Sequence, residues 1–278
     1  MKKLILLCTL LVFSQGFAQK KERIKGSKVV VIQQKKVEAF TAIEILDDLE
    51  ISLIKGDKCG LELEADDNLQ DVLDLRMSGS MLIVSFAKEV SSSKKFNIRL
   101  TYTSDLVSVV AKDKAKISAL ESVKLDNIVF KAQDNARLML NIDSKTCGIM
   151  LNDKAKAEVN DKSENFSLEL SKNAEIKALV SATNFKCDLY QDAEANLEGD
   201  VIEMKVRLDN DSRFNAKKMN AKNTILTIEN ASFAAVNVEK TLKLSASGKT
   251  TVELLGTPKI EIEKFEGTTK LLKREGKQ

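Results

Sequence analysis

Apolar and polar residues alternate along most of this chain, and between residues 107 and 252 the alternation is organised into a short repeat. Each repeat contains a small residue flanked by polar ones, as in Asp113-Lys-Ala-Lys-Ile117 and Asp153-Lys-Ala-Lys-Ala157. The small residues are Ala115, Ala136, Ala155, Ala174, Ala193, Ser212 and Ala231, separated by one interval of 21 residues and then five of 19. A recurrence at a nearly fixed period is the sequence signature of a repeat architecture.

Positions at even distances from the small residue are almost wholly apolar. Two positions after it stand Ile117, Leu138, Ala157, Ile176, Ala195, Phe214 and Phe233, and six before it stand Val109, Phe130, Ile149, Leu168, Cys187, Val206 and Ile225. One position after it stand the mostly charged residues Lys116, Arg137, Lys156, Glu175, Glu194, Arg213 and Ser232. This alternation predicts strands, because successive side chains of a strand point to opposite faces. Helical repeats are disfavoured, because the apolar positions lack the three-and-four spacing of a helix.

One such repeat cannot bury its apolar face alone, whereas identical coils stacked in register can. The repeat therefore predicts an all-β fold: a parallel β-solenoid, as a single-stranded right-handed β-helix-like stack of about 19-residue coils, with a less regular N-terminal β segment. Asp113, Asp134 and Asp153 fit the corner of each coil, because Asp tolerates corner conformations by bonding its own backbone. The small residue is expected to point inward at that corner.

Outside the repeat, alternation predicts further strands and a set of boundaries. Strands are expected at residues 29–33, 40–45, 49–53, 61–65, 81–86 and 96–102, a short helical turn at 66–75, and a loop at 91–95. The predicted organisation is a signal peptide at 1–18, a loose leader at 19–36, an N-terminal β part at 37–105, the repeat solenoid at 106–272 and a tail at 273–278. Pro258 and the polar tail from Lys270 to Gln278 are expected to cap the open end, since exposed strand edges promote aggregation.

The N-terminus has the pattern of a secretory signal peptide. Lys2 and Lys3 precede an apolar run at residues 4–13, and small residues follow, with cleavage expected after Ala18. That run is shorter than the roughly 20 apolar residues that span a bilayer. A lipoprotein signal with Cys8 as the lipid acceptor is the alternative. The chain is therefore predicted to be exported, to the periplasm or the cell surface, with no transmembrane segment in the mature form.

Charge and cysteine content exclude several classes of function. The formal charge is +3 and falls to about +1 without Lys2 and Lys3, with both signs mixed, so nucleic acid is not an expected partner. The chain has no histidine, which excludes Ser-His and Cys-His catalysis, and no closely spaced cysteines for zinc. Cys147 and Cys187 fall in coils two apart, about 9.6 Å, beyond the reach of about 7 Å that a disulfide allows. Cys59 makes the number odd, so we expect free thiols, and neither a metal nor a cofactor.

Two carboxylates are the candidates for catalysis. Glu175 and Glu194 are expected to stack one coil apart on the outer face, as in a polysaccharide-active β-helix enzyme. A solvated charge ladder explains the same pair. Aromatic platforms for sugars are scarce, because Trp is absent and only Tyr102 and Tyr190 are present. The basic column Lys116, Arg137 and Lys156 is either a contact for an acidic polymer or a source of solubility.

The segments outside the repeat resemble a known family. They are Phe40-x-x-Ile43, Ser78-Gly-Ser80 followed by Met81-Leu-Ile-Val84, and Ser247-Gly248 with Gly256-x-Pro258-x-Ile260. Over residues 37–272 the chain is similar to the bacterial family called putative auto-transporter adhesin head, or GIN domain. The resemblance implies an exported β-solenoid and supplies no catalytic residues.

From these observations we predict an exported, non-enzymatic β-solenoid that acts as an interaction, adhesin-like or scaffold module at the bacterial cell envelope. No catalytic, cofactor-binding or metal-binding residue is assigned. Its partner would be a protein or polysaccharide of the envelope, and the stacked design is compatible with a homo-oligomer. The alternative is a polysaccharide-active β-helix enzyme that uses the outer-face carboxylates.

Overall fold

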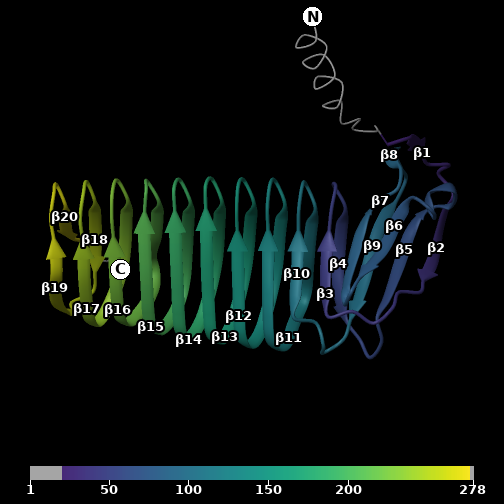
Figure 1. Ribbon diagram of the computed structural model, residues 1–278. Helices are drawn as coiled ribbons and strands as arrows, with labels where there is room; N and C mark the ends of the chain where they lie inside the picture. The colour runs from purple at the N-terminus through teal and green to yellow at the C-terminus, as the bar shows by residue number, and fades with distance from the viewer. Residues whose placement is uncertain (1–20, 276–278) are drawn as a thin grey trace, which may run out of the picture.

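Each repeat forms one long strand that bends around an apolar core and ends at a tight corner (Figure 1). The computed structural model describes residues 21–275. Its long strands are β11 (Lys116–Ala132), β12 (Arg137–Leu151), β13 (Lys156–Ser171), β14 (Glu175–Tyr190), β15 (Glu194–Asp209), β16 (Arg213–Ile228) and β17 (Phe233–Ala246). Neighbours pair in parallel, and from β12 to β15 every pairing keeps an offset of 19 residues. The predicted parallel β-solenoid is confirmed.

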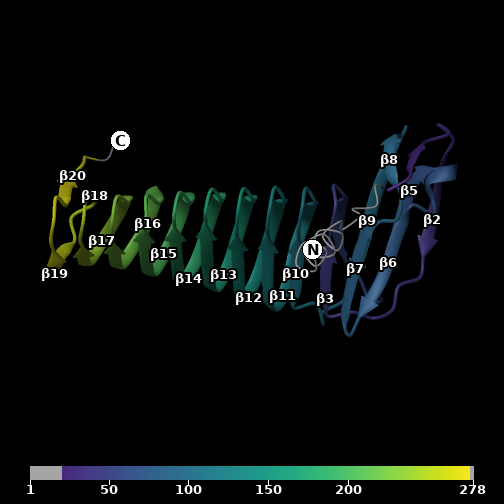
Figure 2. The same ribbon diagram turned by 45° about the horizontal axis from the view of Figure 1, so that its top comes forward.

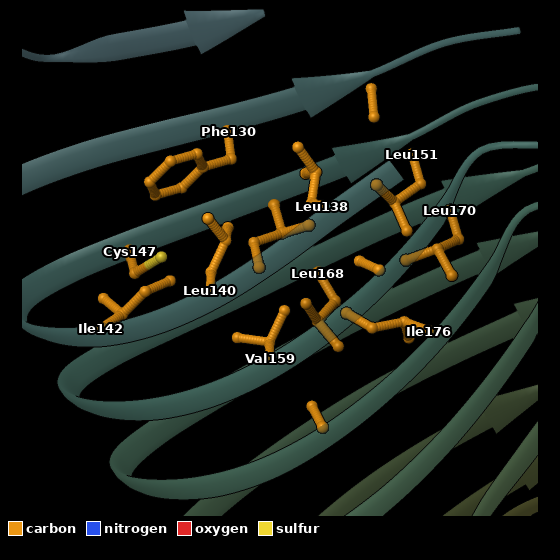
Figure 3. Packing of buried hydrophobic residues seen from close by; sticks show 14 of the residues in the cluster. Phe130, Leu138, Leu140, Ile142, Cys147, Leu151, Val159, Leu168, Leu170 and Ile176 are labelled. Carbon is orange, nitrogen blue, oxygen red and sulfur yellow. The ribbon is translucent and has the colours of Figure 1, made fainter. Parts of the chain in front are cut away.

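The core is a set of stacked apolar columns inside the coils (Figure 3). Leu138, Leu140, Ile149 and Leu151 of one coil are at most 3% exposed, and they lie over equivalent apolar residues of the next. Burying each such side chain contributes roughly 1.5–3 kcal/mol. Because a coil has no core of its own, this stacking is what stabilises it.

The corners confirm the expected positions and revise the reason for them. Asp113, Asp134 and Asp153 have φ values of 56°, 57° and 62°, the left-handed conformation. Their carboxylates bond between coils instead of to their own backbone: Asp113 Oδ2 accepts from the Asp47 amide at 2.9 Å, and Asp134 Oδ2 from the Asp113 amide at 3.2 Å. Lys172 and Gln191 adopt φ 61° at the same place, so stacking fixes the corner whatever the residue type.

The seventh repeat is shifted by one residue from its predicted register. Arg213 pairs with Phe233 and Phe214 with Ala234, so the corner residue equivalent to Ser212 is Ser232 and not Ala231. Ser232 is 1% exposed, whereas Ala231 faces solvent. The predicted inward positions Ile225 and Phe233 are therefore wrong, because one additional residue in the coil turns each of them outward.

The N-terminal part places its first coil inside the stack, not at its end. The coil of β3 (Ala42–Ile45) and β4 (Glu50–Lys55) pairs in parallel with β10 (Ser108–Ala111) and β11 on one side. On its other side it pairs in parallel with β7 (Met81–Phe86) and β9 (Phe96–Tyr102). The chain thus leaves the solenoid after β4 and returns at β10, and the intervening residues build the end of the molecule.

Antiparallel strands close this end (Figure 2). β5 (Gly60–Asp66) pairs with β9 and with β2 (Val30–Lys35), and β6 (Leu73–Ser78) pairs with β7. β1 (Arg23–Lys25) pairs with β8 (Glu89–Ser92), so a strand lies within the expected loose leader and another enters the expected loop. The expected helical turn is shorter than predicted: only Asp67–Leu69 form a 3-10 turn, because β6 already begins at Leu73.

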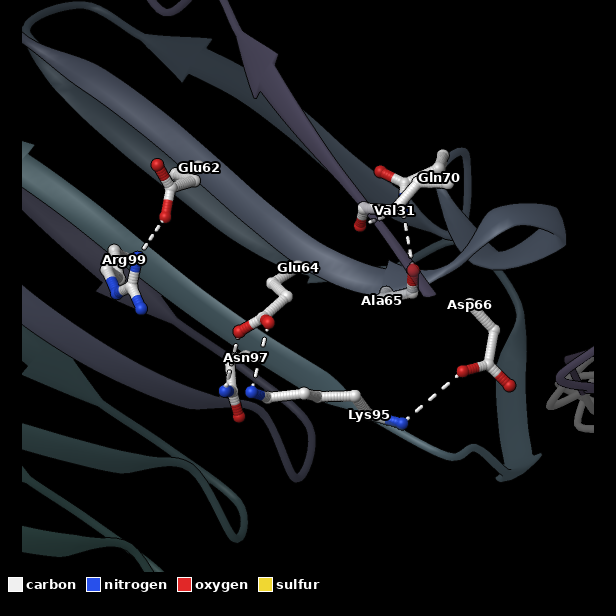
Figure 4. A network of polar contacts seen from close by, with 9 residues as sticks. All are labelled: Val31, Glu62, Glu64, Ala65, Asp66, Gln70, Lys95, Asn97 and Arg99. Atoms are coloured by element: carbon white, nitrogen blue, oxygen red, sulfur yellow. Dashed lines mark hydrogen bonds and ion pairs between the residues drawn. The ribbon is translucent and has the colours of Figure 1, made fainter. Parts of the chain in front are cut away.

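A network of polar contacts links these strands (Figure 4). Asp66 is fully buried, and its carboxylate accepts hydrogen bonds from the amides of Lys28 at 2.9 Å, Lys94 at 3.2 Å and Lys95 at 3.3 Å. Burial alone would raise the pKa of Asp66, but these backbone donors outweigh it and lower that pKa. One ionised side chain of β5 therefore holds two separate stretches of backbone, at Lys28 and at Lys94–Lys95.

The C-terminal strands complete the stack without a cap. They are β18 (Thr251–Leu255), β19 (Lys259–Phe265) and β20 (Lys270–Lys273), of which β19 pairs with β17 and β20 with β18. The predicted cap is wrong within the described residues: Pro258 lies in the corner before β19, and Lys270–Lys273 form a strand of the final coil.

The predicted signal peptide, its cleavage site and Cys8 lie outside the described residues. Between residues 21 and 275, none of the helices has the length and apolar character needed to cross a membrane. In the same range Cys59, Cys147 and Cys187 are free thiols, which confirms the expected absence of a disulfide between Cys147 and Cys187.

Candidate functional site

A long groove crosses the outer surface of the coils from β11 to β16 and has a volume of about 1000 Å³. We call it the lateral groove. Its walls are outward-facing side chains three and five positions after the small residue of each coil. They are Met139, Glu158, Lys177, Asn196 and Asn215 on one side, and Leu120, Asn141, Asn160, Leu179 and Glu198 on the other, joined by Lys218, which pairs with Glu198 after a register shift. Because the coils stack in register, each wall presents one side chain per coil, about 4.8 Å apart.

Irregular pairing marks the two ends of the lateral groove. The register between β11 and β12 shifts after Ala119, which leaves Leu120 outside the ladder with 78% of its surface exposed. At the other end the pairing of β16 with β17 shifts after Ala216, beside Lys217 and Lys218. A bulge re-aims side chains next to it, so both ends carry residues that a regular coil would not present.

The groove walls combine amides, charges and isolated apolar side chains. Asn215 Nδ2 donates to Asn196 Oδ1 at 3.0 Å, and Asn196 Nδ2 donates to Glu194 Oε1 at 2.7 Å. Lys218 lies 2.8 Å from Glu198. Leu120, Met139 and Leu179 are exposed by 78%, 47% and 53%. The surface thus offers hydrogen-bond donors and acceptors beside small apolar platforms, in an arrangement that repeats along the solenoid axis.

The lysines at the far end of the groove are partly engaged. Lys217 lies 2.7 Å from Glu253, and Arg274 contacts the same carboxylate at 2.6 Å. The hydrogen bond from Lys217, followed by the one from Arg274, lowers the pKa of Glu253. This ion pair anchors Lys217 at the groove end.

The two candidate catalytic carboxylates lie side by side, as their sequence spacing predicts, but outside the lateral groove. Glu175 and Glu194 are direct neighbours in the ladder between β14 and β15. Glu175 is bonded to Lys156 at 2.9 Å and Glu194 to Asn196 at 2.7 Å. Neither belongs to the groove lining. The arrangement is that of a solvated charge ladder.

The basic column is also interleaved with acidic partners. Lys116 forms an ion pair with Glu50, and Lys156 with Glu175. Arg137 lies between Lys116 and Lys156 in the ladder. Two of the three charges are therefore compensated on the protein itself, which weakens this column as a site for an acidic polymer.

One buried carboxyl group was not singled out from the sequence. Asp161 is 1% exposed and points into the core in the column of Ile142 and Val180. Ser163 Oγ donates to its Oδ1 at 2.7 Å, and within residues 21–275 its Oδ2 has no hydrogen-bond partner. Burial raises the pKa of Asp161 to about 7, with the Ser163 bond opposing the shift and Asp143 adding to it. Alternation along the repeat already places residue 161 inward. A charged residue at an inward position was therefore the sequence signal that could have identified this buried carboxyl group.

The thiols and carboxylates offer little other chemistry. Burial raises the pKa of the Cys147 and Cys187 thiols, which keeps them protonated and unreactive. Over the described part of the chain, no group of three or more His, Cys, Asp or Glu side chains is placed to hold a metal ion.

Stacked parallel coils with an open groove along them define a β-solenoid repeat protein. The family model described as "Putative auto-transporter adhesin, head GIN domain" matches residues 39–160 and again residues 145–258. The chain belongs to this family.

Solved structures share the fold at low sequence identity. A crystal structure of a "putative adhesin" from Parabacteroides distasonis is 15% identical with a TM-score of 0.66, covering 92% of this chain and 100% of its own. A "putative adhesin" from Parabacteroides merdae is 16% identical with a TM-score of 0.57, covering 90% and 99%. A "putative lipid binding protein" from Parabacteroides distasonis is 14% identical with a TM-score of 0.56, covering 91% and 100%. No curated protein matches the chain.

Proposed function

We propose that this chain is an exported, non-enzymatic binding module of the cell envelope, and that the lateral groove holds an extended polysaccharide. The observation that carries the proposal is the groove itself, which crosses six stacked strands and presents the same wall positions in every coil. A ligand with a repeating polar backbone can meet such a surface in several successive coils. Many weak contacts then add up without any single deep cavity.

The chemistry of the walls favours a polar chain over a fatty one. Asn196 and Asn215 offer amide donors and acceptors, and Lys177 offers a cation. The exposed apolar residues Leu120, Met139 and Leu179 are interspersed with polar lining residues such as Asn141, Glu158 and Asn160. A lipid tail would need a continuous apolar lining. One structural neighbour is described as a lipid-binding protein, so lipid is the comparison that a test must contain.

The exported location rests on the basic and apolar residues at the start of the sequence, and on family membership. Fractionation of cells that express the chain tests it. Recovery in the periplasm or on the surface is expected, and recovery with the cytoplasmic proteins would contradict it.

The binding proposal is tested with the purified chain on a glycan array and on phospholipid vesicles, together with two matched double variants. In Asn196→Ala/Asn215→Ala the altered amide pair lies in the lateral groove, where the two side chains are 3.0 Å apart. In Asn165→Ala/Asn184→Ala the altered pair lies outside it, with a separation of 2.9 Å. Loss of two hydrogen bonds should weaken glycan binding about tenfold in the first variant only.

Three outcomes would contradict the proposal. If the chain bound no glycan on the array, a polysaccharide ligand would be excluded. Binding to phospholipid vesicles and not to glycans would indicate that the ligand of the groove is a lipid. If both double variants weakened glycan binding equally, the binding site would not be the lateral groove.

A further inference from the structure

The central coils of the lateral groove carry polar side chains that have no partner on the protein itself. Glu158, Asn160 and Lys177 line the groove and are exposed. Within residues 21–275, none of these three side chains makes a hydrogen bond or an ion pair. A ligand can therefore bond to them without breaking a contact inside the chain.

The polar residues nearer the end of the groove are already engaged. Asn215 Nδ2 donates to Asn196 Oδ1 at 3.0 Å, and Asn196 Nδ2 donates to Glu194 Oε1 at 2.7 Å. Lys218 forms an ion pair with Glu198 at 2.8 Å. The capacity for new hydrogen bonds is thus concentrated on β13 and β14, in the middle of the groove.

Glu158 and Asn160 stand on opposite walls of the groove in the same coil. They are two residues apart on β13, so both side chains point outward, at a spacing of roughly 6.6 Å along the strand. An ionised carboxylate only accepts hydrogen bonds, whereas the Asn160 amide also donates through its nitrogen. The pair therefore offers an acceptor on one wall and a donor on the other.

An exposed apolar side chain stands in the next coil. Leu179 is the direct neighbour of Asn160 in the ladder between β13 and β14, about 4.8 Å away, and 53% of its surface is exposed. Across the groove, Lys177 is the direct neighbour of Glu158. Their opposite charges leave this part of the groove without net charge, so it selects neither an acidic nor a basic sugar.

The donor, the acceptor and the apolar surface match the three parts of an acetamido group. The N–H and the C=O of a secondary amide point in opposite directions, and the acetyl methyl group lies at the end of the substituent. The N–H can donate to Glu158 while Asn160 donates to the C=O, with hydrogen bonds of about 2.9 Å on each side. The methyl group then points along the groove to Leu179. A hydroxyl group in the same place reaches one wall only and leaves Leu179 in water.

We propose that Glu158, Asn160 and Leu179 form an acetamido subsite, and that the polysaccharide held in the lateral groove contains N-acetylated sugars. Glu158 and Asn160 bind the amide, Leu179 contacts the methyl group, and Lys177 donates to an oxygen of the same sugar. This inference rests on the proposed function, because it names the class of glycan that the groove selects.

Titration calorimetry of the purified full chain with two matched hexasaccharides tests the subsite. The β-1,4-linked hexamers of N-acetylglucosamine and of glucose have the same linkage and differ only in the acetamido or hydroxyl group at position 2 of each sugar. The N-acetylglucosamine hexamer should bind about tenfold more tightly, because buried polar groups that bond to a substituent are left unpaired when the ligand lacks it.

Substitutions in the subsite should reduce this preference. Asn160→Ala and Leu179→Ala should weaken binding of the N-acetylglucosamine hexamer about tenfold and about threefold, and leave binding of the glucose hexamer unchanged. Glu158→Ala should also reduce the preference, whereas Glu158→Gln retains an oxygen that accepts the N–H and should keep most of it. Asn184→Ala and Ile202→Ala are matched controls at exposed positions outside the lateral groove, and they should change neither affinity.

The two proposals fail in distinguishable ways. Equal affinity of the unaltered chain for the two hexamers would overturn the acetamido subsite, and so would a preference that persists in both Asn160→Ala and Leu179→Ala. If a glycan without acetamido groups binds on the array and the N-acetylglucosamine hexamer does not, the subsite is wrong while the lateral groove still binds a polysaccharide. If no glycan binds at all, the proposed function fails and the subsite fails with it.

Discussion

At position 161 a carboxyl group occupies a place that the neighbouring coils give to Ile142 and Val180. Its raised pKa of about 7 has a consequence for stability. The unfolded chain ionises Asp161 near pH 4, whereas the folded chain holds the proton until about pH 7. The unfolded state therefore binds fewer protons across this window, and stability falls as the pH rises through it.

Asp161→Val should stabilise the fold more at pH 8 than at pH 5. From the pKa difference, the gain at pH 8 is about 4 kcal/mol at most, since part of it is offset by the lost bond from Ser163. Urea unfolding at the two pH values measures it. Asp126→Asn removes an exposed carboxylate and serves as the control for the loss of one negative charge. An equal effect of Asp161→Val at both pH values would show that Asp161 does not titrate in this range.

Residue-level features divide into those that alternation reveals and those that it does not. The inward columns, the left-handed corner at Asp113 and the free thiols of Cys147 and Cys187 all follow from spacing and strand geometry. The partners of the corner carboxylates do not, because Asp113 bonds to an amide 66 residues away in sequence. Spacing along one coil carries no information on which coil lies beside it.

At the scale of single elements, the seventh coil shows the limit of a repeat-based alignment. The segment Glu229-Asn-Ala-Ser-Phe233 contains two adjacent small residues, and either could stand at the corner. The preceding period favours Ala231, but the structure uses Ser232, and Ser212 Oγ donates to Ser232 Oγ at 3.3 Å. One added residue in the coil moves each following side chain to the opposite face of the strand. Ile225 and Phe233 are apolar and were therefore plausible core residues, but both point outward.

This register makes a paired prediction. Ser232→Leu should lower the stability by about 1–3 kcal/mol, because the larger side chain is forced into a filled corner between two coils. Ala231→Leu should have almost no effect, because that position faces solvent. Thermal melting of the two variants measures the difference. A larger loss from Ala231→Leu than from Ser232→Leu would restore the register that the period suggests.

Six of the N-terminal strands were expected from the sequence, whereas β1, β6 and β8 were not, and the pairing of none of them was. β3 and β7 alternate like any half-buried strands, and alternation is the same for parallel and antiparallel neighbours. The return of the chain to β10 after an excursion of some fifty residues depends on long-range contacts that no local pattern records. The lateral groove has the same limit: the outer columns were the expected place for binding, but its ends are set by irregular pairing near Leu120 and Lys217.

On the scale of the whole molecule, stability should vary along the solenoid axis. Each central coil is held by a neighbour on both sides, whereas the coil of β19 and β20 has one on a single side among the described residues. In a stack of this kind, the terminal coil opens most easily because only one interface is lost.

Amide hydrogen exchange should therefore reveal a gradient of stability along the stack. The strands β13 and β14 should be the most protected, because each has a parallel neighbour on both sides. The strands β19 and β20 should exchange fastest among the solenoid strands, because each pairs on one side only within the described residues. Mass spectrometry of peptides from the purified chain measures this. Equal protection of β13 and β19 would show that the solenoid opens as one cooperative unit and would contradict the prediction.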